Sequence, residues 1–339
     1  MVSPILIPTY DLPALLKYLS NAAARPQKTW QGWQLSMVDG GSNNRLFRAT
    51  SAEADLAVKF ILPDNRRRAE REFTALCLLA DLPRPAAPAP VWLGVQGYPF
   101  PVVVQCWVEG PCSREPLETD EAWLRLLQLH ALIHTVRPEN SDPLLAGEIF
   151  KAVTTAYSPA QALALVQAQV GRLPLHERNA DLLRLVRGLE DSLAAKSGAD
   201  AAWQNVPEAL CHGDGNLSNF VRRPEGWLAI DWENSGWGDP AFEIADLLAH
   251  PAMFEVPPER RAWAMRTYAR LSAESSAEEK ALLVRIRIYY RVMLVWWVAR
   301  MARCLVEAPL GQDERLAPRP EGWQDEMRAQ YARYLKAAS

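Results

Sequence analysis

The sequence predicts an α+β protein of two lobes, a small β-rich N-terminal lobe and a larger, mainly α-helical C-terminal lobe. Its 339 residues suit two domains of ordinary size. Up to about residue 109 the chain alternates in short apolar runs bounded by Gly, Asn and Pro, which is typical of strands. Beyond Gly110, apolar residues recur at helical spacing over long stretches. We therefore divide the chain into residues 1–109 and 110–339.

The N-terminal lobe is predicted to be a sheet with one helix. The runs that read as strands are 33–38, 45–50, 56–62, 91–94 and 100–108, with a Gly/Asn turn at 40–44. A helix is predicted for residues 66–80, after capping residues at 63–65. Glu72 would share its buried stripe with Leu76 and Leu79, whereas Glu70 lies about 200° around the helix from Glu72. Glu72 is therefore preferred to Glu70 for any functional role.

The C-terminal lobe begins with a predicted helix over residues 121–136, whose Trp123, His130 and His134 are interpreted as core. Helical stretches continue to about residue 202. Asp239 is predicted to cap a helix over residues 241–250 that has proline in its first position. The apolar segment 286–304 contains four arginines, whereas a membrane span needs about 20 mostly uncharged residues. This segment is predicted to be a buried helix.

Composition and charge exclude several classes of function. Hydrophobic residues make up 49% of the chain and charged residues 23%, as in an ordinary globular protein with a large core. The net charge is −3, and the only long basic run is Arg66 to Arg68 with Arg71, so no nucleic-acid partner is expected. Five scattered cysteines without a C-x-x-C pair favour a reducing cytoplasm, and the N-terminus lacks a basic region typical of a signal peptide. We expect a cytoplasmic protein with a small-molecule partner and no membrane.

The segment 210–234 carries the chemistry. Residues 220–222 and 227–230 read as two short strands of a hairpin that turns at 223–226. Folding about residue 225 would set Asn219 opposite Asp231, so that an amide oxygen and a carboxylate converge at the open end of the hairpin. Such hard oxygen ligands suit Mg²⁺. Asp214 would lie on the loop that enters the hairpin, with its carboxylate available for a proton, and the set is typical of phosphoryl transfer.

The motif His212-Gly-Asp-x-x-x-x-Asn219, followed by Ile230-Asp-Trp-Glu233 and Gly238-Asp-Pro240, resembles the aminoglycoside phosphotransferase and choline kinase family. The resemblance extends upstream through the Gly-Gly-Ser-Asn-Asn turn at 40–44 and the Ala-Val-Lys-Phe run at 57–60, and it covers roughly residues 35–250. The sequence departs from the usual family pattern at Asn216 and Leu217, where His and Pro are more frequent. The resemblance implies a protein-kinase-like fold, with ATP bound by the N-terminal lobe and a small hydroxyl substrate by the C-terminal lobe.

Residue roles follow from the same resemblance. It implies that Asp214 is the catalytic base and that Asn219 and Asp231 are the Mg²⁺ ligands. Lys59 would bind the phosphates of ATP, and Glu72 would be its partner. The nucleotide would also meet Gly40, Gly41 and Ser42, and the linker backbone at Cys106 and Val108. At the two glycines, backbone N–H groups can approach phosphates without a Cβ in the way. His212 is interpreted as a hydrogen-bonding residue that shapes the loop.

The identity of the acceptor stays open in the sequence. Acidic residues dominate positions 214–246, namely Asp214, Glu225, Asp231, Glu233, Asp239, Glu243 and Asp246, against only Arg222 and Arg223. This predicts a neutral or cationic hydroxyl substrate, unless arginines such as Arg287 or Arg291 enter from the late helices. Tyr289, Tyr290, Trp296 and Trp297 are interpreted first as core and second as substrate contacts. The alternatives are an aminoglycoside-modifying enzyme, a metabolite kinase of choline, homoserine or fructosamine type, and a pseudokinase, which the complete residue set disfavours.

Overall fold

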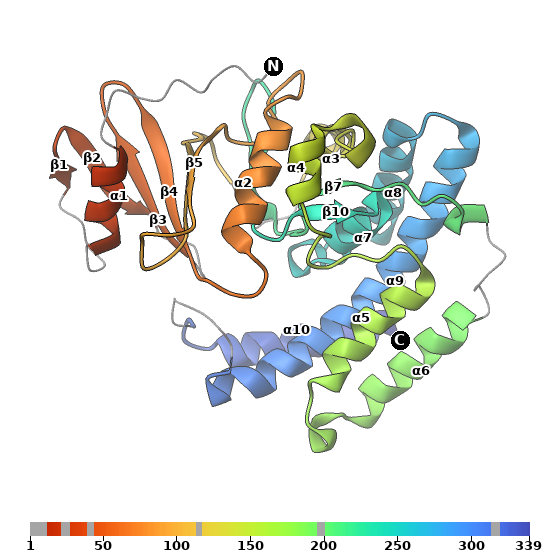
Figure 1. Cartoon of the computed structure of the whole chain (residues 1–339). Helices are drawn as coiled ribbons and strands as arrows, with labels where there is room; N and C mark the ends of the chain where they lie inside the picture. The colour runs from red at the N-terminus through yellow and green to blue at the C-terminus, as the bar shows by residue number, and fades with distance from the viewer. Residues whose placement is uncertain (1–11, 22–27, 39–43, 113–116, 195–200, 313–318) are drawn as a thin grey trace.

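The computed structural model describes residues 12–21, 28–38, 44–112, 117–194, 201–312 and 319–339. Its N-terminal part is a six-stranded antiparallel sheet (Figure 1). In spatial order the strands are β1 (Thr29–Trp30), β2 (Trp33–Val38), β3 (Asn44–Thr50), β4 (Asp55–Ile61), β6 (Val102–Cys106) and β5 (Pro90–Gly94). This confirms the β-rich N-terminal lobe.

Two helices cover the sheet. The helix α1 (Leu12–Asn21), which the sequence analysis did not predict, packs on Val58 and Phe60 of β4 through its buried leucines. The helix α2 (Arg68–Leu79) shares a second core with Ile61. Because side chains alternate along a strand, Lys59 faces the same side as Ile61, toward α2. One face of β4 therefore packs against α1, and the other face carries Lys59 and is directed toward α2.

Two predicted boundaries in this part are wrong. The helix starts at Arg68, not at residue 66, and its N-cap is Arg67, in a left-handed conformation with φ of 53°. Asp64 does not cap the helix, because its carboxylate accepts from the Arg66 N–H and pairs with Arg68 instead. The strand predicted for residues 100–108 runs only over β6, since Pro101 has no N–H with which to extend the ladder.

The C-terminal part is mainly helical. Its helices are α3 (Asp120–Ile133), α4 (Pro143–Glu148), α5 (Pro159–Gly171), α6 (Ala180–Ala194), α7 (Pro240–Ala249), α8 (Pro258–Ser272), α9 (Ser276–Glu307) and α10 (Trp323–Ala338). The predicted Asp239 cap is confirmed, because its carboxylate accepts from the Ala241 N–H. The long α9 contains the segment predicted as a buried helix, and it packs against α5, α7, α8 and α10. No helix of the described residues is both long and apolar enough to span a membrane.

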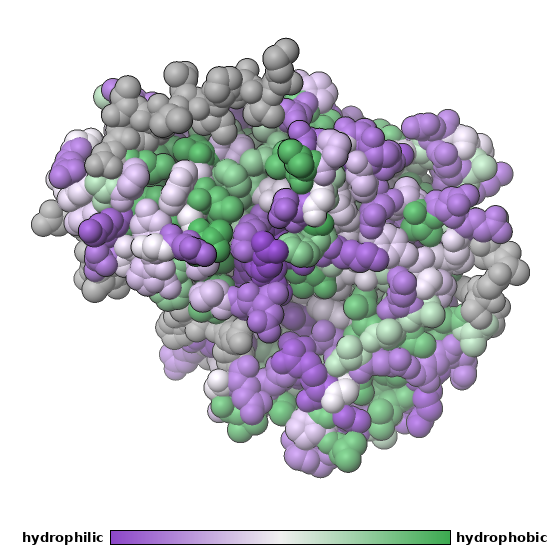
Figure 2. Space-filling view, in the orientation of Figure 1, coloured by the Kyte–Doolittle hydropathy of each residue, from purple (hydrophilic) through white to green (hydrophobic). Residues whose placement is uncertain are grey.

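Two short strand pairs connect the helices of this part. The strands β7 (Ala209–Cys211) and β10 (Gly236–Gly238) pair with each other, as do β8 (Phe220–Val221) and β9 (Leu228–Ala229). The second pair is the predicted hairpin. Figure 2 shows hydrophilic residues gathered in the middle of this face of the molecule, over the junction of the sheet and the helical part.

Candidate active site

A buried lysine and its carboxylate partners form the centre of the candidate site. Lys59 Nζ donates to Glu72 Oε2 over 2.7 Å, and it also contacts the carboxylate of Asp231. Glu233 Oε2 lies 3.9 Å from the same nitrogen. Glu72 is fully buried, and Lys59 is only 7% exposed. The structure thus joins three predicted residues from β4, α2 and the chain just after β9, which are far apart in the sequence.

The charges of this cluster do not balance. Burial raises the pKa of Glu72 to about 7, against the pull of Lys59, and it also raises the pKa of Glu233. Burial opposes the charge of Lys59 as well, but the three carboxylates together raise the pKa of its ammonium group. The pKa of Asp231 is lowered, because Lys59 outweighs the effect of burial. Three acids sharing one lysine attract further positive charge.

Arg68 and Asn44 belong to the site, although the sequence analysis missed both. Arg68 Nη1 lies 3.4 Å from Glu233 Oε1, and Asn44 Nδ2 donates to Glu233 Oε2 over 2.8 Å. Arg68 lies one turn before Glu72 on the same helix. This i, i+4 spacing puts both side chains on one helix face and could have identified Arg68 as a site residue. Asn44 is the last residue of the predicted turn at 40–44 and opens β3. Gly40, Gly41 and Ser42 of that turn lie outside the described residues.

The loop that carries Asp214 is fixed by His212. The two ring nitrogens of His212 lie 3.1 Å from the Asp214 carbonyl oxygen and 2.8 Å from the Ile230 carbonyl oxygen. The imidazole therefore bridges the loop to the chain just before Asp231, in the loop-shaping role predicted for it. Asp214 Oδ1 accepts from the Asn216 N–H over 3.0 Å. Gly213 has a φ of 75°, and a Cβ there would lie 2.6 Å from the Asn234 carbonyl oxygen, so only glycine fits.

Glu243 anchors the same loop from helix α7, a role that the sequence did not suggest. Its Oε1 accepts from the backbone N–H groups of His212, over 2.7 Å, and Gly213, over 3.0 Å. Its Oε2 lies 2.5 Å from His134 Nε2, and His134 Nδ1 lies 2.6 Å from the Tyr268 hydroxyl. Since these hydrogen bonds already use the groups, we interpret the proximity of Cys211 to His134 and Glu243 as packing rather than as a metal centre.

The predicted register of the hairpin is wrong by one residue. Phe220 pairs with Ala229, and the Ile230 N–H donates to the Asn219 carbonyl oxygen over 2.9 Å. Asn219 thus stands opposite Ile230, and Asp231 lies one residue further on, because the hairpin turns about a point between residues 224 and 225 rather than about residue 225. Asp231 has a φ of 67°, a strained value for a residue other than glycine. Both side chains still belong to the open end of the hairpin, and amide and carboxylate oxygens suit Mg²⁺.

The two residues predicted to meet the adenine are Cys106, which ends β6, and Val108, which lies in the linker after it. The Cys106 N–H donates to the Ala89 carbonyl oxygen and the Trp107 N–H to the Asp55 carbonyl oxygen, on the opposite side. Cys106 is exposed. Gln105, which the sequence analysis missed, is 7% exposed and has a buried Oε1 without a hydrogen-bond partner among the described residues. It shares a sheet face with Ala57 and Lys59, because Ala57 pairs with Gln105 and side chains alternate along β4.

The pKa of Glu72 makes stability fall as the pH rises. The folded value of about 7 lies above the ordinary 4.5, so the folded protein holds a proton that the unfolded chain releases between these values. This contribution is fully present below pH 4.5 and is lost as the pH rises through 7. At about 1.4 kcal/mol per pKa unit it amounts to roughly 3 kcal/mol. Urea unfolding of the metal-free protein at pH 5 and pH 8 should show this loss, and Glu72→Gln should remove it. An equal slope in both proteins would contradict the assignment.

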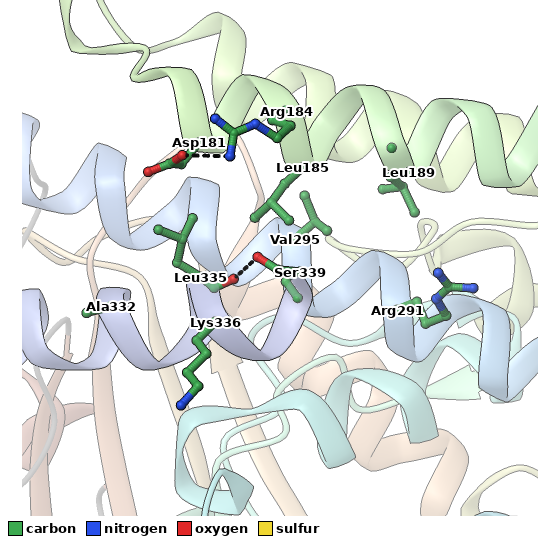
Figure 3. Close-up of a pocket in the computed structure, with 12 residues that line it drawn as sticks. Asp181, Arg184, Leu185, Leu189, Arg291, Val295, Ala332, Leu335, Lys336 and Ser339 are labelled. Carbon is green, nitrogen blue, oxygen red and sulfur yellow. Dashed lines mark hydrogen bonds and ion pairs between the residues drawn. The ribbon is translucent and has the colours of Figure 1, made fainter.

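A cavity of about 580 Å³ lies elsewhere, between α6, α9 and α10 (Figure 3). Its lining includes apolar Leu185, Leu189, Val295 and Leu335 and charged Arg291, Lys336 and Asp181, the last paired with Arg184 over 3.1 Å. None of the predicted site residues lines it. We therefore assign the chemistry to the buried lysine cluster and not to this cavity.

Comparison with known proteins bears on this geometry. The phosphotransferase enzyme family model matches residues 35–280. A search of curated proteins finds no significant match. Among solved structures, a spectinomycin phosphotransferase in complex with ADP and spectinomycin is 14% identical, with a TM-score of 0.60, and the match covers 90% of this chain and 92% of that one.

Two further structures have the same fold. A choline kinase from Cryptosporidium parvum Iowa II is 10% identical, with a TM-score of 0.60 and coverage of 96% of this chain and 95% of that one. A macrolide 2'-phosphotransferase from Brachybacterium faecium is 18% identical, with a TM-score of 0.55 and coverage of 95% and 98%. The predicted protein-kinase-like fold of two lobes is confirmed. Because the family model matches most of its length, the chain belongs to the phosphotransferase enzyme family and is a phosphotransferase.

Proposed function

We propose that this chain transfers the γ-phosphoryl group of Mg-ATP to a hydroxyl group of a small molecule. The observation that carries the proposal is the hydrogen-bonded connection between Lys59, with its partners Glu72 and Asp231, and the loop of Asp214 through His212. A cation for phosphates, oxygen donors for a metal ion and a carboxylate for a proton are the groups that phosphoryl transfer requires. Most of the catalysis is then alignment and charge neutralisation.

Each residue has a distinct task in this proposal. Asp214 accepts the proton of the substrate hydroxyl as its oxygen bonds to the γ-phosphorus and the bond from that phosphorus to the bridging oxygen of ADP breaks. Lys59 holds the phosphates, and Glu72 orients Lys59. Asn219 and Asp231 hold Mg²⁺, which when bound neutralises charge on the phosphates. The excess of carboxylates around Lys59 supports this assignment, since an added cation relieves it.

The nucleotide is proposed to bind in the N-terminal lobe, residues 1–109. Gly40, Gly41 and Ser42 cover the phosphates, and the backbone at Cys106 and Val108 meets the adenine. Structures of the same fold are complexed with ADP and with GDP. ATP as the donor accords with a cytoplasmic location.

The acceptor is proposed to be a neutral or cationic hydroxyl compound bound by residues 110–339. The acidic surroundings of Asp214 support this, and solved structures of this fold include phosphotransferases for spectinomycin and kinases for choline. The first candidate is an aminoglycoside-modifying enzyme. The second candidate is a metabolite kinase of choline, homoserine or fructosamine type. A turnover assay with Mg-ATP across amino alcohols, sugars and aminoglycosides tests both. Complete lack of turnover despite tight Mg-ATP binding would instead indicate a pseudokinase.

Asp231→Asn is expected to abolish the Mg²⁺-dependent stabilisation of the protein by ATP. Asparagine keeps the size of the side chain and tolerates the left-handed backbone at this position, so the fold should survive. At ligand 100 times its dissociation constant the wild-type protein should gain about 2.7 kcal/mol. Thermal shift with ATP, with and without Mg²⁺, measures this gain. An unchanged Mg-ATP shift in the variant would remove Asp231 from the metal site, and Asp191→Asn on exposed α6 serves as the matched control.

A further inference from the structure

A second polar cluster lies beside the Asp214 loop and has no part in the proposed phosphate site. It consists of Asp246, His250, Trp297 and Arg300. The loop packs directly on this end of α7, since a Cβ on Gly215 would lie 2.8 Å from the Leu247 Cα and 3.4 Å from the Asp246 carbonyl oxygen. The cluster is therefore next to the proposed base, on helices α7 and α9 of the acceptor-binding lobe.

Two polar atoms of this cluster lack partners. Asp246 Oδ1 and Trp297 Nε1 are both buried and lie near each other, since the Trp297 N–H lowers the pKa of Asp246, but neither forms a hydrogen bond of normal geometry within the described part of the chain. A buried polar atom without a partner costs about 1–3 kcal/mol, so such atoms call for an explanation, and a ligand that completes them is one. Burial and, to a lesser extent, the carboxylates of Asp214 and Glu243 together raise the pKa of Asp246 to about 7. A positive charge close by would therefore stabilise the ionised carboxylate of Asp246.

The cation nearby that belongs to the chain is Arg300, which lies at the exposed side of the cluster. Its guanidinium stacks over Trp296, 5.4 Å from the ring centroid, and over Trp297, 5.7 Å away. Trp297 in turn meets His250 edge to face, with 5.1 Å between the centroids. Arg300 makes no ion pair with any described residue. Its charge lowers the pKa of both Asp246 and His250, although burial is the larger cause for His250.

His250 adds a neutral donor to the cluster. Its Nδ1 accepts from the Ala252 N–H over 3.2 Å, which leaves the ring proton on Nε2. Burial lowers the pKa of His250 to about 4, so the ring is uncharged at neutral pH. The cluster therefore offers a buried carboxylate, two neutral N–H donors and an exposed guanidinium, whereas acidic residues dominate the segment 214–246 in the sequence. Of the two late arginines considered there, Arg291 lines the cavity beside α6 instead.

We propose that the acceptor is a small zwitterion, a hydroxyl compound with an ammonium group that pairs with Asp246 and a carboxylate that pairs with Arg300. The inference rests on the proposed function, whose neutral-or-cationic acceptor it narrows. A purely cationic acceptor would leave the positive charge of Arg300 without a partner. A hydroxy acid would bring a negative charge toward the carboxylates of Asp214 and Asp246, which repel it. A zwitterion satisfies both ends of the cluster, as a charge-complementary site requires.

Binding of matched compounds to the full-length protein loaded with Mg-ADP tests the proposal by calorimetry. The compounds are L-serine and L-homoserine, the corresponding amino diols without the carboxylate, and the corresponding hydroxy acids without the amine. At least one zwitterion should bind about tenfold or more tighter than both of its singly charged analogues, the size of a charged hydrogen bond. Equal binding of the amino diols, or no binding of either zwitterion, would overturn the proposal.

Two variants separate the ends of the cluster. Arg300→Gln should weaken the zwitterion about tenfold and leave the amino diol unchanged, whereas Asp246→Asn should weaken both. Arg287→Gln, at an exposed position of the same helix, is the control and should change neither. An Arg300→Gln effect that is equal for zwitterion and amino diol would contradict the pairing. Failure of the proposed function looks different: no Mg-ATP binding and no phosphorylation of any hydroxyl compound by the wild-type protein.

Discussion

Asp214→Asn is expected to lower kcat by about 10²- to 10⁴-fold, the range that a positioned general base contributes. The substitution removes the proton acceptor without removing the shape of the side chain. Its amide oxygen can still accept from the Asn216 N–H, as Asp214 Oδ1 does. The loop itself is held by His212 and Glu243, through groups that the substitution does not touch.

The Mg-ATP thermal shift of Asp214→Asn should therefore equal that of the wild type, which separates lost chemistry from lost binding. Single-turnover kinetics with an acceptor from the substrate panel measures the chemical step directly. Asp191→Asn again serves as the control, because Asp191 is exposed on α6. A kcat within tenfold of the wild-type value would exclude Asp214 as the base.

The sequence predicts well what depends on local pattern. The buried stripe of α2 separates Glu72 from Glu70, and in the structure Glu72 meets Lys59 while Glu70 pairs with Arg67 near the surface. The dipeptide Asp239-Pro240 predicts that Asp239 caps α7, and the structure confirms this cap. Short-range geometry decides each of these features, so neighbouring residues were enough to predict them.

Features that depend on distant partners were not predictable in this way. Glu243 reads as an ordinary helix acid, and its acceptor role appears only when α3 brings His134 against it, from 109 positions away. The Asp239 carboxylate has a second task, a buried ion pair with Arg285 of α9 at 3.0 Å, which no local pattern encodes. The one-residue error in the hairpin has a simpler origin. The turn signal at residues 223–226 is centred between residues 224 and 225, as the hairpin is, and placing the centre on residue 225 itself shifted the expected partner by one.

The contacts of Glu243 also explain how the Asp214 loop is kept in place. The loop contains a glycine with positive φ and is followed, after the hairpin, by Asp231 with positive φ. Positive φ is no strain for glycine, but at Asp231 it costs about 1–3 kcal/mol and persists only when the surroundings hold it. Glu243 connects this loop to the helices α3 and α8 through His134 and Tyr268. The base is thus positioned by the core of the helical lobe, not by the loop alone.

Glu243→Ala is accordingly expected to cost about 3–5 kcal/mol of unfolding free energy, the loss that follows when one partner of a buried charged pair is removed. The variant leaves the N–H groups of His212 and Gly213 and the ring of His134 without their acceptor. Glu243→Gln should recover part of the loss, because its amide oxygen can accept from the two N–H groups while His134 changes tautomer. Glu259→Ala, at an exposed position of α8, should stay within about 0.5 kcal/mol of the wild type.

The pH dependence identifies the cause of the Glu243→Ala loss. Burial would raise the pKa of Glu243, but the hydrogen bond with His134 and the neighbouring histidines lower it to about 2, below the ordinary 4.5. Because the folded pKa is depressed, the stabilisation is present above pH 4.5 and is lost as the pH falls through 2. The difference in unfolding free energy between wild type and Glu243→Ala, measured in urea, should therefore shrink by roughly 3 kcal/mol from pH 6 to pH 2. A gap that stays constant with pH would mean that the loss comes from packing rather than from the carboxylate and its hydrogen bonds.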